Sequence, residues 1–275
     1  MPAALFPGVQ THYKGDHHAV LDAGAHVLAW TPADQVPVLW VSPLVVFEPG
    51  VAVRGGIPVV FPWFGAGAGG ARTPAHGFAR TAQWERVAMV DDLVETGRLE
   101  VRHRLTSQGI DSAPFSADLV SEFTSDLLRV SLAVTNTGTS VFTYEEALHT
   151  YLAVSDVARI SIDGLDGCPY ADKVAGTEQV QAGAVRFAGE TDRIYAHTGE
   201  VVVDDPEWSR RIGVSKDGSA HTVIWNPGAT RGAALADVGT YWADFVCVEA
   251  ANTGPAAVTV LPDETHILTQ TLRLV

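Results

Sequence analysis

Apolar and polar residues alternate along most of the chain, and a period of two predicts β-strands. The run DLLRVSLAVTNTG, residues 126–138, alternates in this way and then ends in a Thr-Asn-Thr-Gly turn. Such runs recur roughly every 8–12 residues, a spacing that favours an antiparallel sandwich or barrel. The predicted strands are Pro37–Phe47, Val51–Phe61, Trp84–Val90, Leu99–Leu105, Ala117–Phe123, Leu127–Asn136, Phe142–Val154, Arg159–Asp163, Ala184–Phe187, Ile194–Val203, Arg210–Lys216, His221–Trp225, Phe245–Ala251, Ala256–Val260 and Ile267–Leu274.

Long segments of helical period with a cap at each end are missing from the sequence. The nearest is Ala233–Ala243, which predicts a short helix or turn. Because strands do not alternate with helices, the pattern disfavours a doubly wound α/β fold. The glycine-rich run Gly65–Gly70 is too short for a linker and is interpreted as a loop. We therefore predict an all-β protein, a large antiparallel β-sandwich with few short helices, as a single domain over residues 1–275.

The stretch Thr143–Val154 predicts a long strand with two different faces. Phe142, Tyr144, Leu148, Leu152 and Val154 share the apolar face, and Glu145, Ala147, His149 and Tyr151 share the other. A histidine among small, acidic and aromatic neighbours indicates the lining of a cavity. The alternative is that His149 lies on a solvated face.

Composition and charge narrow the class of protein. With 47% hydrophobic and 18% charged residues, the chain can bury a large core. Its net charge of −14 argues against a nucleic-acid surface and against docking on an anionic membrane. Two cysteines form no disulfide framework, the start of the chain predicts no signal peptide, and no window predicts a membrane helix. We expect a cytoplasmic protein that is a monomer.

Two segments carry isolated basic residues that could bind an anion. Arg54 is the only charged residue between Glu48 and Arg72, so a buried guanidinium there needs a partner from the protein or from a ligand. His76 and Arg80 follow in HGFAR, on a predicted loop from which both side chains could reach one ligand. Alternatively, Arg54 pairs with an internal carboxylate in a bulged strand.

Glu249 lies within the very apolar strand DFVCVEAAN. Desolvation there would raise its pKa and make it a usable general base near neutral pH. The alternative is a structural ion pair with an arginine.

The sequence predicts no metal site. His12, His17 and His18 cluster near the N-terminus, but no carboxylate or further histidine follows at ligand spacing, so we interpret them as a solvated segment. The chain also lacks a Gly-x-Ser-x-Gly elbow, and its glycine-rich run precedes no helix that could bind a dinucleotide.

Several segments together resemble the hexose-6-phosphate mutarotases, the glucose-6-phosphate 1-epimerases of the aldose 1-epimerase (galactose mutarotase-like) superfamily. They occur in the order SPLVVFEPGVAVRGGIPVVFPWFG, HGFAR, EEALHTYLAVSDV, GLDGCPYADK, ETDRIY, VIWNP and FVCVEAAN. The resemblance extends from about residue 40 to the C-terminus and implies the supersandwich fold of that superfamily.

The resemblance also implies roles for individual residues. His149 in ALHTYL matches the catalytic histidine of the family, and Glu249 in VCVEAAN matches its catalytic glutamate. Arg54 and Arg80 match arginines that contact the phosphorylated sugar.

Two further contacts are implied and one is lost. Asp192 in ETDRIY matches a substrate-binding aspartate, and His76 stands where the superfamily has a sugar-contacting histidine. Ala75 stands where some relatives have a glutamine that contacts substrate, so this contact must be absent or replaced.

The implied reaction interconverts the α and β anomers of a hexose phosphate such as glucose 6-phosphate, without a metal or cofactor. A base removes the proton of the anomeric hydroxyl and an acid protonates the ring oxygen, so we expect Glu249 as base and His149 as acid on opposite sides of the sugar. A histidine pKa of about 6.5 lets both protonation states interchange. The alternative is a non-catalytic carbohydrate-binding β-sandwich.

Overall fold

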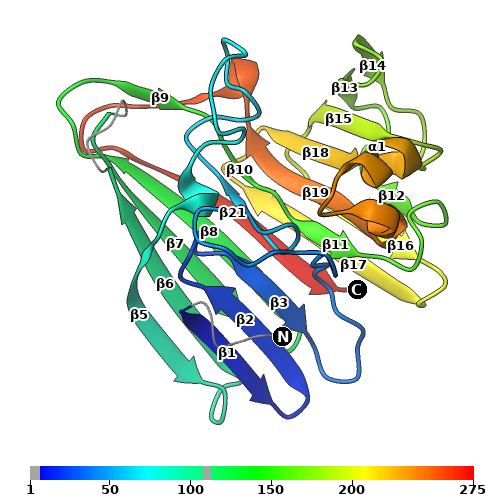
Figure 1. The fold of residues 1–275 in the computed structure, drawn as a ribbon, viewed down its shortest axis with the longest axis horizontal. Coiled ribbons are helices and arrows are strands. Elements are labelled where there is room, and N and C mark those ends of the chain that lie inside the picture. The colour runs from blue at the N-terminus through cyan, green and yellow to red at the C-terminus, as the bar shows by residue number, and fades with distance from the viewer. Residues whose placement is uncertain (1–6, 108–112) are drawn as a thin grey trace.

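The computed structural model describes residues 7–107 and 113–275 of the chain, and these residues form antiparallel sheets (Figure 1). The first large sheet, here called the β19 sheet, has the order β14-β13-β15-β18-β19-β10-β4, with β11 also paired with β19. Its strands are β4 (Val59–Val60), β10 (Glu146–Leu148), β11 (Tyr151–Ala153), β13 (Pro169–Asp172), β14 (Thr177–Val180), β15 (Thr191–Ala196), β18 (His221–Asn226) and β19 (Phe245–Asn252).

The second large sheet, here called the β8 sheet, has the order β12-β16-β17-β21-β8-β7-β6-β5. Its strands are β5 (Glu85–Asp92), β6 (Arg98–Thr106), β7 (Phe115–Phe123), β8 (Leu127–Asn136), β12 (Ser161–Asp163), β16 (Val201–Asp205), β17 (Arg210–Asp217) and β21 (Thr265–Leu274). A smaller sheet contains β1 (Gly8–Tyr13), β2 (Asp16–Leu21) and β3 (Val27–Thr31), and β9 (Phe142–Tyr144) pairs with β20 (Val258–Val260).

Helical segments are few and short, as the sequence predicted. They are η1 (Ala79–Thr81), α1 (Gly228–Ala234), η2 (Gly239–Asp244) and η3 (Gly254–Ala256). The predicted helix or turn at Ala233–Ala243 corresponds to the end of α1, a connecting turn and η2. The prediction of an all-β antiparallel sandwich is therefore confirmed.

The main core lies between the two large sheets. Leu148, Ile224 and Val248 of the β19 sheet belong to the same buried cluster as Leu132 and Leu268 of the β8 sheet. Apolar side chains of this kind supply most of the free energy of folding, at about 25 cal/mol for each Å² removed from water. The core thus fixes one face of the β19 sheet and leaves the other face for different contacts.

The second face of the β19 sheet carries its own smaller clusters. Trp40, Trp225 and Phe245 pack together there with Val238, which lies between α1 and η2. Because β19 is covered on both faces, every residue from Phe245 to Asn252 is buried. This explains why the strand reads as an almost unbroken apolar run.

Two predicted strands before residue 62 are mostly loops. Pro37–Phe47 forms only isolated bridges, and Val51–Phe61 contains only the short β4. Prolines at positions 37, 43, 49 and 58 cannot donate a backbone hydrogen bond to a ladder. Gly55 has φ of 119°, and a Cβ added there would lie 2.4 Å from the carbonyl oxygen of Trp40. The apolar pattern was correct about burial near Gly55 but wrong about strand structure.

The predicted strand Phe142–Val154 is divided into β9, β10 and β11, although its apolar face is as predicted, as is the other face from Ala147 onward. Leu148 and Leu152 point into the main core, whereas Ala147 and Tyr151 belong to clusters on the opposite face. The interruption falls at residues 149–150. There, the backbone N–H of Thr150 donates to the carbonyl oxygen of Leu148 at 3.1 Å, and its hydroxyl donates to the side chain of Gln270.

Other differences concern weakly patterned segments. Ile194–Val203 divides into parts of β15 and β16, and Ala184–Phe187 contributes only a bridge at Val185. The sequence pattern missed β1, β2, β3, β13 and β14. The interpretation of the N-terminal histidines as solvated is wrong for His18, which is fully buried against the ring of Phe123.

Candidate active site

The register of neighbouring strands gathers polar and aromatic side chains on the second face of the β19 sheet. Tyr151 on β11 lies opposite Cys247 on β19. Cys247 in turn lies opposite Trp225 on β18, and Trp225 lies opposite Asp192 on β15. Directly opposed residues place their side chains on the same face of a sheet. These four residues therefore form one row across four adjacent strands.

His149 and Glu249 belong to the next row. The ladder between β10 and β19 continues with unchanged register into the ladder between β11 and β19. This register places His149 opposite Glu249, even though residues 149–150 lie outside the strands. The backbone N–H of His149 donates to the carbonyl oxygen of Pro58 at 3.0 Å, which holds the histidine beside the β4 edge.

The two side chains contact each other directly. His149 Nε2 lies 3.2 Å from Glu249 Oε1, and the side chains are only 9% and 1% exposed. Nδ1 of His149 and Oε2 of Glu249 are buried without a hydrogen-bond partner among the described residues. Each group therefore has one atom in the shared contact and one atom with unused hydrogen-bonding capacity.

The surroundings of the pair oppose charge on both groups. Burial raises the pKa of Glu249 well above its usual value, and the carboxylate of Asp192 raises it further. Burial lowers the pKa of His149 well below its usual value, and the neighbouring His76, Arg80 and Arg54 lower it further. In the free protein, an uncharged carboxyl group in contact with a neutral imidazole is therefore favoured.

The side-by-side arrangement differs from the expected one, in which acid and base stood on opposite sides of a sugar. Directly opposed residues of neighbouring strands have Cβ atoms only about 5 Å apart, so His149 and Glu249 approach a ligand from the same side.

Arg54 lies at one end of this face and has two partners within the protein. Its Nε donates to Asp237 Oδ2 at 2.9 Å, and its Nη1 donates to the hydroxyl of Tyr151 at 3.0 Å. The alternative that Arg54 pairs with a carboxylate of the protein is thus correct for its Nε. Its side chain is still 24% exposed, so part of the guanidinium can reach a ligand.

Aromatic rings line the space around the pair. The ring of Tyr151 stacks on His149 with centroids 4.9 Å apart and planes 13° apart. Trp225 approaches His149 edge-on at 6.1 Å. Because Trp225 stands between Asp192 and Cys247 in its row, a ligand that reaches from Asp192 to His149 must pass over the indole.

The loop from Pro62 to Phe78 carries His76 into the site. The ring of His76 lies 5.7 Å from that of His149, and its Nδ1 accepts a hydrogen bond from the Gly65 N–H at 3.3 Å. Burial, together with Arg80 and Arg54, lowers the pKa of His76 to about 3, so this histidine is neutral at physiological pH. Gly77 makes the turn possible, because a Cβ there would lie 2.0 Å from the carbonyl oxygen of Phe61.

Arg80 differs from Arg54 because no carboxylate of the described residues forms an ion pair with it. Its Nη2 donates to the carbonyl oxygen of Ala75 at 2.8 Å, and its buried Nε has no partner within the described chain. Burial lowers the pKa of the guanidinium. Ala75 thus contributes its main-chain carbonyl oxygen to the placement of Arg80.

Asp192 lies two strands away from Glu249, which corresponds to about 10 Å across the sheet. Burial raises its pKa, whereas Lys173 and Arg231 act in the opposite direction. The backbone of Asp192 is fixed by the Lys173 N–H, which donates to its carbonyl oxygen at 2.8 Å. All six residues singled out from the sequence thus lie around one face of the β19 sheet.

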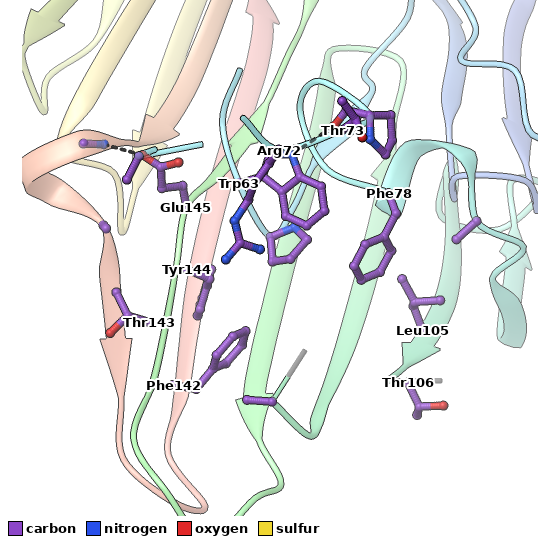
Figure 2. A pocket seen from close by; sticks show the side chains of 17 residues that line it. Trp63, Arg72, Thr73, Phe78, Leu105, Thr106, Phe142, Thr143, Tyr144 and Glu145 are labelled. Atoms are coloured by element: carbon purple, nitrogen blue, oxygen red, sulfur yellow. Dashed lines mark hydrogen bonds between the residues drawn. The ribbon is translucent and has the colours of Figure 1, made fainter. Parts of the chain in front are cut away.

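A separate groove of about 1090 Å³ lies behind the loop that carries His76. Figure 2 shows Trp63, Arg72 and Phe78 on its wall, with Phe142 and Tyr144 below them. The Trp63 indole donates to the carbonyl oxygen of Pro74 at 2.9 Å, and the Arg72 guanidinium lies over the Trp63 ring. These contacts brace the loop from the side opposite to His76.

Glu145 fastens the same loop to the sheet. Its carboxylate accepts hydrogen bonds from the N–H groups of Phe64 at 2.9 Å and Gly254 at 2.6 Å. Phe64 contacts His76 edge-on at 4.9 Å. Glu145 therefore supports the position of His76 and does not line the space around Glu249, although its sequence position suggested that face.

The sequence analysis missed two residues of the site, Asp237 and Trp225. Asp237 lies in a weakly patterned turn, and nothing in its sequence context shows that it reaches Arg54. Trp225 was visible only as an apolar strand position, and its proximity to His149 depends on the sheet register. Tyr151 was placed on the face of His149, but its stacking on the imidazole was not predicted. Within the two described ranges, no group of three or more potential ligands could hold a metal ion, and no helix there is long and apolar enough to cross a membrane.

The fold is that of the galactose mutarotase-like β-sandwich proteins. The chain superposes on the crystal structure of "a putative mutarotase (YeaD)" from Salmonella typhimurium with a TM-score of 0.89 and 28% identity, over 97% of this chain and 90% of that one. A galactose mutarotase related enzyme from Lactobacillus acidophilus has a similar fold, with a TM-score of 0.77 and 12% identity over 98% and 97% of the two chains.

The chain belongs to the aldose 1-epimerase family, whose family model matches residues 11–273. A protein of Escherichia coli (strain K12) named "Putative glucose-6-phosphate 1-epimerase" is 33% identical over 232 residues, which cover 83% of this chain and 77% of that protein. Membership of this family supports an epimerase.

Proposed function

We propose that the protein interconverts the α and β anomers of a hexose 6-phosphate such as glucose 6-phosphate. The observation that carries the proposal is the buried contact of 3.2 Å between His149 Nε2 and Glu249 Oε1. A protein that only bound a sugar would not need a carboxylate and an imidazole in contact with each other and short of other partners. Two similar proteins, from Escherichia coli and Salmonella typhimurium, carry names that agree with this substrate.

Glu249 acts as the base and His149 as the acid in this proposal. Glu249 removes the proton from the anomeric hydroxyl while His149 protonates the ring oxygen, and the ring opens to the aldehyde. Rotation about the first carbon–carbon bond and the reverse proton transfers give the other anomer. A proton-transfer residue of this kind contributes a factor of about 10²–10⁴ to a rate.

The proton balance explains why burial of the pair is useful. With a closed sugar ring, the pair must be a carboxylate and an imidazolium, whereas ring opening leaves a carboxyl group and a neutral imidazole. The shifts in pKa of His149 and Glu249 both favour the uncharged form. The environment therefore stabilises the protonation state that accompanies the open-chain intermediate.

The remaining residues provide the contacts to substrate. Arg80, which has no carboxylate partner in the described chain, is the main phosphate ligand in this proposal, and Arg54 assists it. Asp192 accepts hydrogen bonds from sugar hydroxyls, and neutral His76 contacts the sugar beside His149. Phosphate binding at a distance from the anomeric carbon would orient the sugar for proton transfer.

The direct test measures the rate of anomer exchange by NMR saturation transfer, with glucose 6-phosphate, with and without the protein. We expect acceleration by the wild type and none by His149→Asn or Glu249→Gln. The alternative, a non-catalytic carbohydrate-binding protein, predicts that the wild type binds the sugar phosphate without accelerating exchange. Full activity of both variants would show that the pair is not the catalytic one.

A further inference from the structure

Arg54 is held on two sides before any ligand arrives. Asp237 occupies its Nε at 2.9 Å, and the hydroxyl of Tyr151 occupies one N–H of Nη1 at 3.0 Å. A guanidinium has five N–H groups in a fixed plane. Three of them remain, one on Nη1 and two on Nη2; one of the Nη2 groups lies on the same edge as Nε, and the other lies at the far end of the guanidinium plane.

This pattern restricts how Arg54 can bind an anion. A phosphate or carboxylate can bind a guanidinium end-on through Nη1 and Nη2, or side-on through Nε and one Nη. Asp237 occupies the side-on edge, so the end-on edge is the one left for a ligand. The side chain of Arg54 is 24% exposed, which leaves that end accessible.

The supports of Arg54 are themselves anchored in the fold. Asp237 lies between α1 and η2, next to Val238, which is completely buried. The N–H groups of Val238 and Gly239 both donate to the carbonyl oxygen of Leu235 at 2.9 Å, so the turn is closed on itself. Although its side chain is 37% exposed, Asp237 therefore extends from a fixed backbone.

Tyr151 connects Arg54 with His149. Its hydroxyl accepts the hydrogen bond from Arg54, while its ring stacks on His149 at 4.9 Å. Tyr151 is only 2% exposed, and Cys247 opposes it in the adjacent strand. One rigid side chain thus sets the position of the guanidinium relative to the imidazole.

We propose that Asp237 and Tyr151 are positioning residues that hold Arg54 for end-on binding of the substrate phosphate. The inference rests on the proposed function, in which Arg54 contacts that phosphate. The carboxylate of Asp237 is itself an anion and repels the phosphate. Its effect on the orientation of Arg54 outweighs this repulsion.

The test compares Asp237→Asn and Tyr151→Phe with wild type. Asparagine keeps the size of the side chain but removes its charge, and phenylalanine keeps the ring on His149 but removes the hydroxyl. For glucose 6-phosphate, we expect each variant to raise KM about tenfold, the lower end of the contribution of a hydrogen bond to a charged group. The effect on kcat should be smaller than the effect on KM, and the loss on free glucose should be smaller than on the phosphorylated sugar.

The double variant sharpens the test. Because both substitutions release the same guanidinium, their effects on KM should be less than additive. Asp204→Asn is the matched control, because Asp204 pairs with Arg211 at the surface of the β8 sheet and its side chain is 41% exposed. That variant should behave as wild type, and thermal melting should show that all variants are folded.

Direct binding of inorganic phosphate separates this inference from the proposed function. Binding of phosphate, measured by calorimetry, requires no turnover and should weaken about tenfold in Asp237→Asn and Tyr151→Phe. If the wild type failed to interconvert anomers but these variants still lost phosphate affinity, only the proposed function would be wrong. Unchanged or tighter phosphate binding by Asp237→Asn, or an equal loss on glucose and glucose 6-phosphate, would overturn the positioning role.

Discussion

Glu146 and His266 form a second buried carboxylate–imidazole contact, on the core-facing side of the same sheet that carries His149 and Glu249. The two distances are similar, 3.0 Å between His266 Nε2 and Glu146 Oε1 and 3.2 Å between His149 Nε2 and Glu249 Oε1. Both glutamates are almost completely buried. A comparison of the two pairs therefore isolates the effect of their surroundings.

The neighbours of the two histidines are opposite in kind. The hydrogen bond with Glu146 raises the pKa of His266, whose side chain is 27% exposed. Asn252 also donates to Glu146 at 2.9 Å, so that pair belongs to a hydrogen-bonded network. His149, in contrast, is buried, and its cationic neighbours lower its pKa further. Solvent and a carboxylate partner thus favour the charged form of His266, whereas burial and nearby cations disfavour the charged form of His149. Burial raises the pKa of Glu146 as it does that of Glu249, so the histidines carry the difference.

The largest predicted difference between the pairs is in catalysis. Glu249→Gln should reduce the catalysed exchange of glucose 6-phosphate anomers about 10²–10⁴-fold, because the base is removed. Its thermal stability should be unchanged or raised, since a buried carboxyl group with an unpartnered oxygen becomes an amide.

Glu146→Gln is the matched control for that experiment, because it makes the same chemical change in a glutamate of the same sheet. It should keep the rate of exchange within about twofold, since Glu146 lies on the opposite face. Saturation-transfer NMR gives both rates. Equal losses of exchange rate in the two variants would show that the surroundings of the two pairs do not decide which pair is catalytic.

The second prediction concerns the cations around His149. Arg80→Ala should raise KM for glucose 6-phosphate about 10–100-fold, the range for loss of a hydrogen bond to a charged group. The loss with free glucose should be much smaller, because no phosphate is present. Steady-state kinetics with both sugars checks this, and an equal loss on both would assign Arg80 a structural role.

The sequence predicted which side chains the site contains better than how they meet. Period two placed His149 and Tyr151 on one face, and the apolar context of Glu249 indicated desolvation. The direct contact of His149 with Glu249 depends on strand register, which no local pattern specifies. Asp237 lies in a polar turn far from Arg54 in sequence, so its role required the three-dimensional fold.

The same limit applies to the fold. Well-alternating strands such as Leu127–Asn136 were predicted with their observed bounds, because one face is buried and the other is exposed. The segment before Arg54 is apolar but rich in Pro and Gly, and it forms isolated bridges in place of a strand. Leu44, Val46 and Val51 within it are exposed, so apolar content there predicted neither strand structure nor full burial.

The third prediction is a pH profile that depends on the same cations. The acid side of the kcat/KM profile with free glucose should report protonation of Glu249, the base, whose pKa is raised by burial and lowered by Arg80. Removal of a nearby positive charge raises the pKa of a carboxyl group. In Arg80→Met, the acid side should therefore shift to higher pH. A shift to lower pH, or none, would mean that Arg80 does not act electrostatically on the pair.

The smallest expected effect is on thermal stability. This effect is largest in acid and shrinks as the pH rises. Because folding raises the pKa of His266, its stabilising contribution is complete below the unfolded value of about 6.5 and is lost as the pH rises through the higher folded value. His266→Gln should therefore lower Tm by a few degrees in acid, and the difference from wild type should shrink as the pH rises. His221→Gln provides a control of opposite sign, since burial lowers the pKa of His221 and its cost to wild type should appear only below about pH 6.5. If His266→Gln changed Tm equally at every pH, His266 would not carry a charge in its contact with Glu146.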